Sequence, residues 1–351
     1  MSVQKTATDT TSSVSLTLDE ARDLAIAALT RRGADNRNAR AVADIMIRAE
    51  RDRCASHGLF RLQGYCASLD SGKVDGAAHP TLHDMAPGVL KVDGKGGFAP
   101  LALELGLPAL ADRARQQGVA VLGLTDIYHF AALWPEVETL GELGLCGLAM
   151  TQASPMVAPA GGTKPFFGTN PLAFSWPRPG QDPFVFDQAT AALARGEIMI
   201  MARDGHDAPD GAGIDPDGNP TNDPAKILEG AQLPFGGYKG SNIALMIELL
   251  AGALIGSVFS VESGRQDNKD GGPPVGGEFI LAMDPSRFGD AGWAAHTEVL
   301  FKELEAIGVS RLPGTRRRLA RQETPSQGIR LPKALYDTVQ DLAVGNDTDG
   351  D

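Results

Sequence analysis

A serine–histidine pair followed by an arginine is the part of the sequence best suited to acid–base chemistry. Ser56 and His57 are adjacent, and Arg61 follows four residues after the histidine. An imidazole can donate or accept a proton near neutral pH, and a neighbouring hydroxyl can fix its tautomer. A guanidinium can hold a carboxylate through two parallel hydrogen bonds. These types predict a proton donor beside a carboxylate clamp; a helix-end histidine near a surface arginine is the structural alternative.

Two basic segments could bind phosphate groups. Gly236 and Gly237 would let the backbone approach a ligand, and Lys239 supplies a point charge. The arginine-rich run from Arg311 to Arg318 offers guanidinium groups to a phosphate dianion, such as the 2′-phosphate that distinguishes NADP from NAD. A solvated face or a salt-bridged helix start is the alternative interpretation of this run.

A strand-to-helix turn in the middle of the chain is a further candidate. Residues 118–124 form an apolar run with β-branched residues, and apolar residues recur at helical spacing after residue 137. The pattern predicts that Asp126–His129 is a loop entering a helix. Unpaired amides at a helix start suit a phosphate, although an ordinary turn with a buried aromatic fits as well.

A glycine pattern resembles a shortened dinucleotide-binding fingerprint. Gly94-x-Gly96-x-x-Ala99 follows an apolar segment and precedes a helix-like run to Gln117. This is the residue-level argument for a Rossmann domain. Against it, Pro108 interrupts the helix, and the next acidic residues lie past the usual spacing for a ribose carboxylate. We interpret these glycines as a turn.

Composition limits the classes of function. The chain has 351 residues, 42% of them hydrophobic, and a net charge of −12. An acidic chain has no long-range attraction for nucleic acid or anionic lipid. Three cysteines suggest no disulfide framework, and no His, Cys or carboxylate group has metal-ligand spacing, so we expect no metal. No signal peptide or long apolar run is evident, which favours the cytoplasm and no membrane partner.

Helical patterns surround these candidates. Thr17 and Glu20 form a capping-box pattern ahead of a helix that ends near Gly33, and Asn36 could cap a second helix through Arg51. Residues 204–237 are rich in glycine, proline and aspartate, which predicts a long ordered loop over the site. Residues 241–256 form a nearly all-apolar helix, which predicts burial or a subunit contact.

Four longer segments resemble the malate/L-lactate dehydrogenase-like family. They are SHGLFR at 56–61, HFAALWPEVE at 129–138, FGTNPLAF at 167–174 and LPFGGYKG at 233–240. Within the family, the sequence is most similar to reductases of Δ1-piperideine-2-carboxylate and Δ1-pyrroline-2-carboxylate. The similarity extends from about Leu18 to about Ala343.

The resemblance implies roles for individual residues. It implies a catalytic relay of Ser56, His57 and Glu197, and a substrate site of Arg61, Thr169, Arg195 and Gly196. It implies that NADP(H) contacts the following residues: His129, Phe130, Ala131, Ala132, Leu133, Asp187, Gln188, Ala189, Tyr238, Lys239, Arg311, Leu312, Pro313, Gly314, Thr315, Arg316 and Arg317.

Three of these positions depart from the pattern of the relatives. Glu197 stands where they have an aspartate, so the carboxylate arm is one methylene longer. Arg195 replaces a histidine that faces the substrate, and its fixed positive charge could favour a second substrate carboxylate. Tyr238 replaces a histidine before the lysine; stacking or a hydroxyl bond could substitute for it.

The resemblance also implies an architecture. We expect an α/β protein with a non-Rossmann, NADP-binding mixed β-sheet domain at residues 118–277. A helical, substrate-binding domain is expected from both chain ends, at residues 17–117 and 278–344. Disordered tails are expected at 1–16 and 345–351. The relatives are usually homodimers, and Ile243–Ile255 is a candidate for burial between subunits.

The expected function is NADPH-dependent reduction of cyclic 2-imino acids to L-pipecolate or L-proline. A dehydrogenase of 2-oxo or 2-hydroxy acids, such as malate or ureidoglycolate, is the first alternative, and Arg195 supports it. A non-catalytic protein that binds imino or amino acids is the second. The presence of both Ser56 and His57 argues against it.

Overall fold

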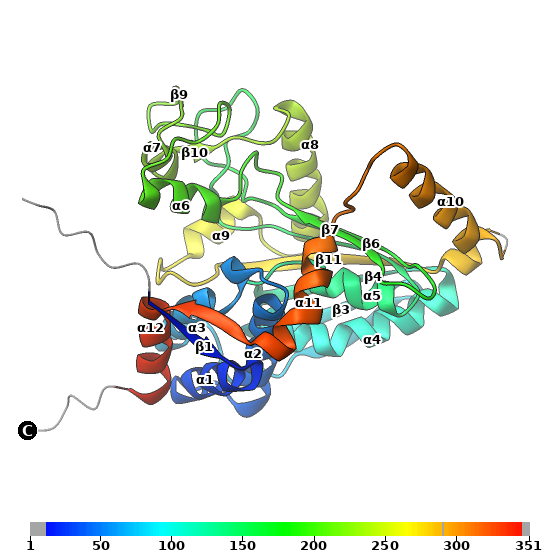
Figure 1. Cartoon of the computed structure of the whole chain (residues 1–351), viewed down its shortest axis with the longest axis horizontal. Coiled ribbons are helices and arrows are strands. Elements are labelled where there is room, and N and C mark those ends of the chain that lie inside the picture. The colour runs from blue at the N-terminus through cyan, green and yellow to red at the C-terminus, as the bar shows by residue number, and fades with distance from the viewer. Residues whose placement is uncertain (1–11, 290, 346–351) are drawn as a thin grey trace, which may run out of the picture.

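A seven-stranded mixed sheet forms the centre of the molecule, which we describe from a computed structural model covering residues 12–289 and 291–345 (Figure 1). The strand order is β2-β3-β4-β11-β5-β6-β7. Their bounds are Thr81–Ala86, Val89–Phe98, Val119–Tyr128, Val275–Met283, Cys146–Thr151, Leu172–Trp176 and Phe184–Gln188. Only β3 and β4 pair in parallel among these strands, because helix α4 (Ala99–Gln117) crosses over between them.

Alternating side chains make the sheet the middle of three layers. On β11, Ile280 and Ala282 pack with α4 and with α5 (Trp134–Glu142), whereas Phe279 and Leu281 pack on the opposite face. That face is covered by the apolar helix α8 (Tyr238–Ile247), which continues as a π-helical turn, η3 (Glu248–Leu254). Successive residues of a strand point to opposite faces, so the near-continuous apolar letters of β4 and β11 follow from burial on both sides.

The two chain ends form a helical unit beside the sheet (Figure 1). It contains α1 (Leu18–Arg31), α2 (Asn36–Arg51), α3 (Leu62–Asp70) and α12 (Lys333–Val344), which share one core. The expected capping box at Thr17 is confirmed, while α2 is capped by Asp35 rather than by Asn36.

The predicted domain limits need correction. Ser13–Leu16 is strand β1, paired with β12 (Ile329–Pro332), so the tail predicted for 1–16 is wrong for these residues. Residues 1–11 and 346–351 lie outside the described residues. The boundary at 277/278 falls inside β11, and the boundary at 117/118 separates α4 from the sheet on which it packs. The reason is that the sheet recruits strands from both halves of the chain.

Two predicted loops are also more regular than expected. Residues 204–237 contain helix α7 (Pro224–Glu229) and a small sheet of β8 (Gly213–Ile214), β9 (Pro220–Thr221) and β10 (Ala231–Gln232). The glycines at 94–97 are not a turn, because they lie within β3 at a shift of register. A Cβ on Gly94 would lie 2.3 Å from Ile127, so glycine permits the close approach of β4.

The remaining helices lie at the edges. They are α6 (Arg195–Asp204), α9 (Ser260–Gln266), α10 (Trp293–Ala306) and α11 (Thr315–Gln327), with short 3-10 turns at Ala55–His57, Leu59–Arg61 and Pro285–Arg287. In Figure 1, α10 projects from the body and α11 returns to the helical unit. Within residues 12–289 and 291–345, no helix is long and apolar enough to span a membrane.

Candidate active site

The predicted acid–base pair is formed in the short turns between α2 and α3. Ser56 Oγ lies 3.1 Å from His57 Nδ1, which is hydrogen-bond distance. The turn is set by Glu50, whose carboxylate accepts a hydrogen bond from Leu59 N at 2.8 Å. A Cβ on Gly58 would lie only 2.1 Å from Glu50 Oε1, so a larger residue there would displace the Glu50 carboxylate. A buried carboxylate of α2 therefore fixes the position of the pair.

Arg61 is held beside the pair with most of its donors free. Its Nε donates to Ser56 O at 2.8 Å, and its guanidinium carbon lies 4.3 Å from the centre of the Phe130 ring. Among the described residues, no carboxylate forms an ion pair with it. A guanidinium whose terminal N–H groups are unused is suited to bidentate binding of a ligand carboxylate.

The electrostatics of the turn keep His57 neutral. Burial lowers the pKa of His57 to about 4, and the nearby charges of Arg61 and His129 act in the same direction. Burial likewise lowers the pKa of Arg61. A ligand carboxylate on Arg61 would cancel part of that positive charge, so it would make protonation of His57 easier.

The start of α6 lies against this pair, but the expected relay is not closed. A Cβ on Gly196 would lie 4.0 Å from Ser56 Cβ, which places the two residues side by side. Glu197 accepts a hydrogen bond from Ala194 N at 3.4 Å, so it caps its own helix. The relay role of Glu197 stays a prediction. Arg195, at the same helix start, has a pKa lowered by burial.

The loop that carries Thr169 is fixed by buried polar groups. Thr190 donates to Thr169 O through both its N and its Oγ1, at 2.8 and 2.9 Å. The next residue, Asn170, is fully buried and donates to Glu248 Oε1 at 2.8 Å. Ser260 donates to the same Glu248 carboxylate through both its N and its Oγ. These buried hydrogen bonds tie the loop to the start of the π-helical turn.

Asp187, at the end of β7, joins two predicted cofactor segments. Its Oδ2 accepts hydrogen bonds from Leu133 N at 2.9 Å and Trp134 N at 3.0 Å, which are the free amides at the start of α5. The phosphate interpretation of this helix start is therefore wrong for these two amides. Strand β4 also continues through Tyr128, so the loop begins at His129 rather than at Asp126. Burial raises the pKa of Asp187 to about 6.

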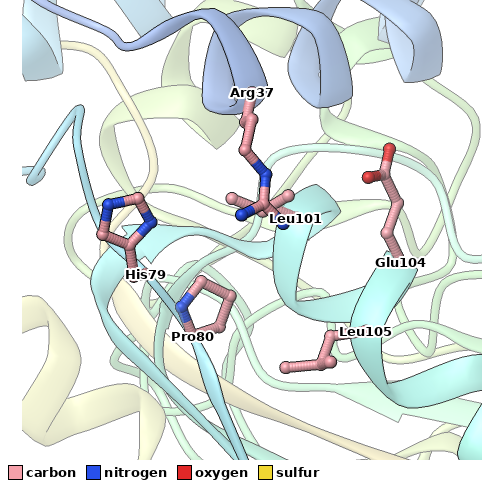
Figure 2. Close-up of a pocket in the computed structure, with 6 residues that line it drawn as sticks. All are labelled: Arg37, His79, Pro80, Leu101, Glu104 and Leu105. Carbon is pink, nitrogen blue, oxygen red and sulfur yellow. The ribbon is translucent and has the colours of Figure 1, made fainter.

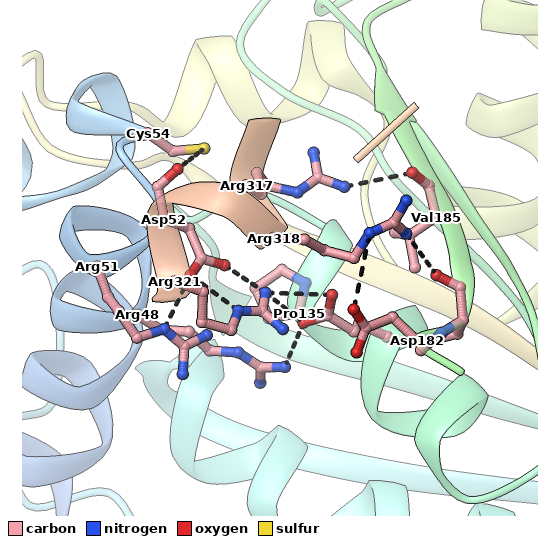
Figure 3. A network of polar contacts seen from close by, with 12 residues as sticks. Arg48, Arg51, Asp52, Cys54, Pro135, Asp182, Val185, Arg317, Arg318 and Arg321 are labelled. Carbon is pink, nitrogen blue, oxygen red and sulfur yellow. Dashed lines mark hydrogen bonds and ion pairs between the residues drawn. The ribbon is translucent and has the colours of Figure 1, made fainter. Parts of the chain in front are cut away.

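The arginine run lies against the same strand. Arg317 donates to Val185 O at 3.3 Å and Arg318 donates to Pro183 O at 3.2 Å, as Figure 3 shows. Both therefore attach α11 to β7, whereas Arg311 and Arg316 stay exposed. Gly314 begins the helix in a left-handed conformation, with φ of 82°, and no side chain caps the helix start.

The segment 236–240 meets the other end of this site. Phe235 N donates to Thr190 O at 2.9 Å, and a Cβ on Gly240 would lie 3.1 Å from the same oxygen. Tyr238 and Lys239 are exposed at the start of α8, which no side chain caps. The starts of α8 and α11 thus both combine free amides with positive charge, which suits phosphate groups. The residues present fit a dinucleotide.

Two buried carboxylates beside this site, Glu136 and Glu278, were missed, and they lie against His129, which was predicted only as a cofactor contact. His129, Glu136 and Glu278 come from the end of β4, from α5 and from β11, and their ligand atoms lie within 4.8 Å of one another. The expectation of no metal rested on sequence spacing, which cannot reveal such a cluster. A charged residue inside the apolar run of β11 was the available signal.

A separate hollow of about 270 Å³ lies away from these residues (Figure 2). It is lined by Arg37, His79, Pro80, Leu101, Glu104 and Leu105. None of the residues predicted for catalysis, substrate or cofactor lines it. The predicted site is instead assembled where the ends of β4 and β7 meet the helical unit.

The chain belongs to the malate/L-lactate dehydrogenase family, whose sequence profile matches residues 16–340. It is thus an oxidoreductase of a pyridine-nucleotide-dependent family that acts on small molecules. It is 49% identical over 326 residues to the Δ1-pyrroline-2-carboxylate/Δ1-piperideine-2-carboxylate reductase of Pseudomonas aeruginosa, covering 92% of this chain and 97% of that protein. It is 48% identical to the Δ1-pyrroline-2-carboxylate reductase of Ancylobacter novellus, covering 94% and 97%.

A solved structure shows the same fold. The Δ1-piperideine-2-carboxylate reductase of Pseudomonas syringae pvar. tomato superimposes with a TM-score of 0.90 at 41% identity, covering 94% of this chain and 99% of that one. The expected mixed α/β fold and family are confirmed.

Proposed function

We propose that this chain is an NADPH-dependent reductase of cyclic 2-imino acids that forms L-pipecolate or L-proline. The relatives named above are reductases of Δ1-pyrroline-2-carboxylate or Δ1-piperideine-2-carboxylate, which supports the substrate class. The observation that carries the proposal is the guanidinium of Arg61, which forms no ion pair among the described residues and donates to Ser56 O beside the Ser56–His57 pair. A carboxylate clamp next to a proton carrier is what a 2-imino carboxylate requires.

Each residue of the turn has a distinct task in this proposal. Arg61 and Thr169 hold the ring carboxylate and so orient the imine carbon. His57, with its tautomer fixed by Ser56 and with Glu197 as the predicted third member, carries the proton for the ring nitrogen. The bound cofactor supplies the hydride. The protein contributes orientation and electrostatics.

The cofactor proposal rests on the two uncapped helix starts. Lys239 at α8, and Arg311 and Arg316 at α11, are exposed cations that can hold phosphate groups, including a 2′-phosphate. The sheet supports a cofactor domain other than a Rossmann domain, because a doubly wound parallel sheet would need more than one parallel pair. We propose that residues 129–133 and 187–189 line the nicotinamide half.

NADPH consumption is the direct test. Purified protein is assayed with Δ1-piperideine-2-carboxylate, Δ1-pyrroline-2-carboxylate, oxaloacetate and pyruvate, each with NADPH and NADH. We expect turnover on the cyclic imines and preference for NADPH. Faster turnover of oxaloacetate would contradict the imine proposal. Equal turnover with NADH and NADPH would contradict only the roles proposed for Arg311 and Arg316, and not the imine reduction.

A second candidate function is favoured by one residue. Arg195 is half-buried and directly precedes Gly196, which lies beside Ser56, and no carboxylate in the described parts of the chain forms an ion pair with Arg195. A free guanidinium there could bind the distal carboxylate of a dicarboxylic 2-oxo acid. In an Arg195→His variant, which restores the residue of the relatives, any oxaloacetate activity should fall while imine activity is retained.

A further inference from the structure

The cluster of His129, Glu136 and Glu278 is buried without conventional partners. Its side chains are 6%, 1% and 0% exposed. His129 Nε2 lies 3.5 Å from Glu136 Oε1 and 3.6 Å from Glu278 Oε2, distances too long for strong hydrogen bonds. Within the described residues, His129 Nε2 and all four carboxylate oxygens lack a hydrogen-bond partner.

Such a cluster is stable only if its charge is balanced. Two carboxylates and a neutral imidazole would bury two negative charges, which is costly without compensation. No arginine or lysine forms an ion pair with either glutamate within the described parts of the chain. The balance must therefore come from protons on the cluster itself or from a bound cation.

The groups around the cluster favour protons. Asp187 on β7 adds negative charge near His129, Tyr65 on α3 lies near Glu136, and His57 faces His129 from the catalytic turn. The positive charge of Arg61 acts to lower the pKa of His57 and of Tyr65, and the positive charge of Arg317 acts to lower the pKa of Asp187.

The same groups shift both ends of the cluster toward holding protons. Burial lowers the pKa of His129, but the charges of Glu278, Glu136 and Asp187 outweigh it and raise the pKa overall. Burial raises the pKa of Glu278. One proton on His129 and one shared by the two carboxyl groups leave the cluster neutral.

We propose that His129, Glu136 and Glu278 form a shared-proton cluster that stores a proton beside the catalytic turn, with Glu136 and Glu278 as positioning residues that keep His129 charged. The storage itself is independent of the substrate. Its use in catalysis rests on the proposed imine reduction.

The reaction explains why a store is useful. Reduction of an imine adds one hydride to carbon and one proton to nitrogen, and the electron pair of the C=N π bond becomes the N–H bond. His57 is neutral at rest, and its single remaining N–H is too weakly acidic for this step, so a second proton must reach it. The cluster loses one proton per turnover, leaving His129 neutral, and water restores that proton after the product leaves.

The first test measures protonation without substrate. Protein labelled with [13C-ε1]-histidine is titrated by NMR, and the His129 signal is identified by its loss in His129→Gln. In wild type, we expect His129 to titrate above the usual range of a histidine. In Glu278→Gln, which cannot accept a proton, the His129 transition should move down by about one pH unit or more, because the opposite charge that raises it is gone. Glu136→Gln should act in the same direction and serves if Glu278→Gln does not fold.

The second test connects storage with catalysis. A one-unit downward shift means a tenfold smaller protonated fraction above the transition, so kcat of Glu278→Gln should fall about tenfold at alkaline pH with little change in KM. Glu138→Gln is the matched control, because Glu138 lies on the same helix but pairs with Arg48 and Arg321. Its pH profile should keep the wild-type shape.

Three outcomes would overturn the proposal. One is a His129 signal that titrates at or below the usual range of a histidine, or identically in wild type and both glutamine variants. Another is a pH profile of Glu278→Gln that matches wild type. The third is a divalent cation found at one equivalent by elemental analysis and lost in Glu278→Gln, since a cation would replace the stored proton. Absence of imine turnover together with the expected NMR shift would reject only the proposed reaction.

Discussion

At the scale of single residues, the environment of His57 decides what it can do. The residue is half-buried, bonded to Ser56 and surrounded by the positive charges of Arg61 and His129. These charges oppose a proton on the imidazole until a ligand carboxylate neutralises Arg61. If Arg61 binds the substrate carboxylate as proposed, we expect substrate binding and proton uptake by His57 to be coupled.

Removing the imidazole should affect turnover rather than cofactor binding. In His57→Ala we expect kcat to fall about 10²–10⁴-fold, the usual contribution of a general acid or base. The Kd for NADPH, measured by fluorescence titration, should change by less than threefold because His57 is not in a predicted cofactor segment. His79→Ala, an exposed histidine in the hollow of Figure 2, is the control and should retain turnover. Equal kcat in both variants would remove His57 from the mechanism.

The lowered pKa of His57 also predicts a pH dependence of stability. The unfolded chain protonates His57 near pH 6.5, whereas the folded protein does so only near pH 4. The unfolded state therefore binds more protons in this window, so His57 contributes stability at pH 7 that is lost as the pH falls from 6.5 through 4. Melting temperatures between pH 7 and pH 5 should fall less in His57→Ala than in wild type. An equal or steeper fall would contradict the assigned pKa.

At the scale of elements, a polar network joins helices far apart in the sequence (Figure 3). Arg321 on α11 bonds Asp52 Oδ1 at 3.0 Å, after the end of α2, and Glu138 Oε2 at 2.9 Å on α5. Asp52 is fully buried, so its charge depends on these partners. The network holds the segment that leads into the catalytic turn.

Breaking this network should destabilise the fold. For Arg321→Ala we expect a loss of about 3 kcal/mol in the free energy of unfolding, at the low end for a buried pair because Arg51 and Arg48 still face the carboxylates. Arg203→Ala removes an exposed pair with Asp204, which solvent screens, so it should leave the free energy of unfolding nearly unchanged. Urea denaturation of the two variants compares them. Equal losses would show that burial does not matter here.

The helix formed by α8 and η3 connects the two halves of the predicted site. Its start carries Tyr238 and Lys239, and its π-helical turn begins at Glu248, which binds Asn170 beside Thr169. In Asn170→Ala, a positive φ of 35° becomes unfavourable and Glu248 loses a donor. We expect KM for the imino acid to rise about tenfold while the Kd for NADPH is unchanged. A rise in the Kd for NADPH with an unchanged KM for the imino acid would place the loop of Thr169 and Asn170 in the cofactor half of the site instead.

At the scale of the whole molecule, an apolar face remains exposed. Leu249 and Leu254 of η3 are 51% and 65% exposed, on the helix predicted to lie between subunits. We propose that a second copy of the chain covers this face. Leu249→Asp should then shift the protein from dimer to monomer in light scattering. Leu300→Asp, on the projecting helix α10, is the comparison. A dimer that survives Leu249→Asp but not Leu300→Asp would place the interface on α10.

Local patterns predicted the helices and strands well wherever the residues that determine an element lie within that element. Thr17 caps α1 by accepting a hydrogen bond from Glu20 N, three residues further along the same segment. The apolar run of β4 likewise indicated a buried strand. The motif residues Ser56 and His57 were found because adjacency in sequence placed them in hydrogen-bond contact. By contrast, the pattern at 94–97 could not reveal a bulge, since the residue that Gly94 accommodates is Ile127 on another strand.

The sequence by itself determined the family, the cap of α1, the buried strands and the residue types of the catalytic turn, because these depend on spacing along one segment. Only the tertiary structure decided that Asp187 occupies the free amides of α5 and that Glu278 faces His129. Pairing of β4 with β11 brings residues about 150 positions apart into one buried volume. Burial and charge act through space, so the groups that govern protonation in this site are set by strand pairing rather than by local pattern.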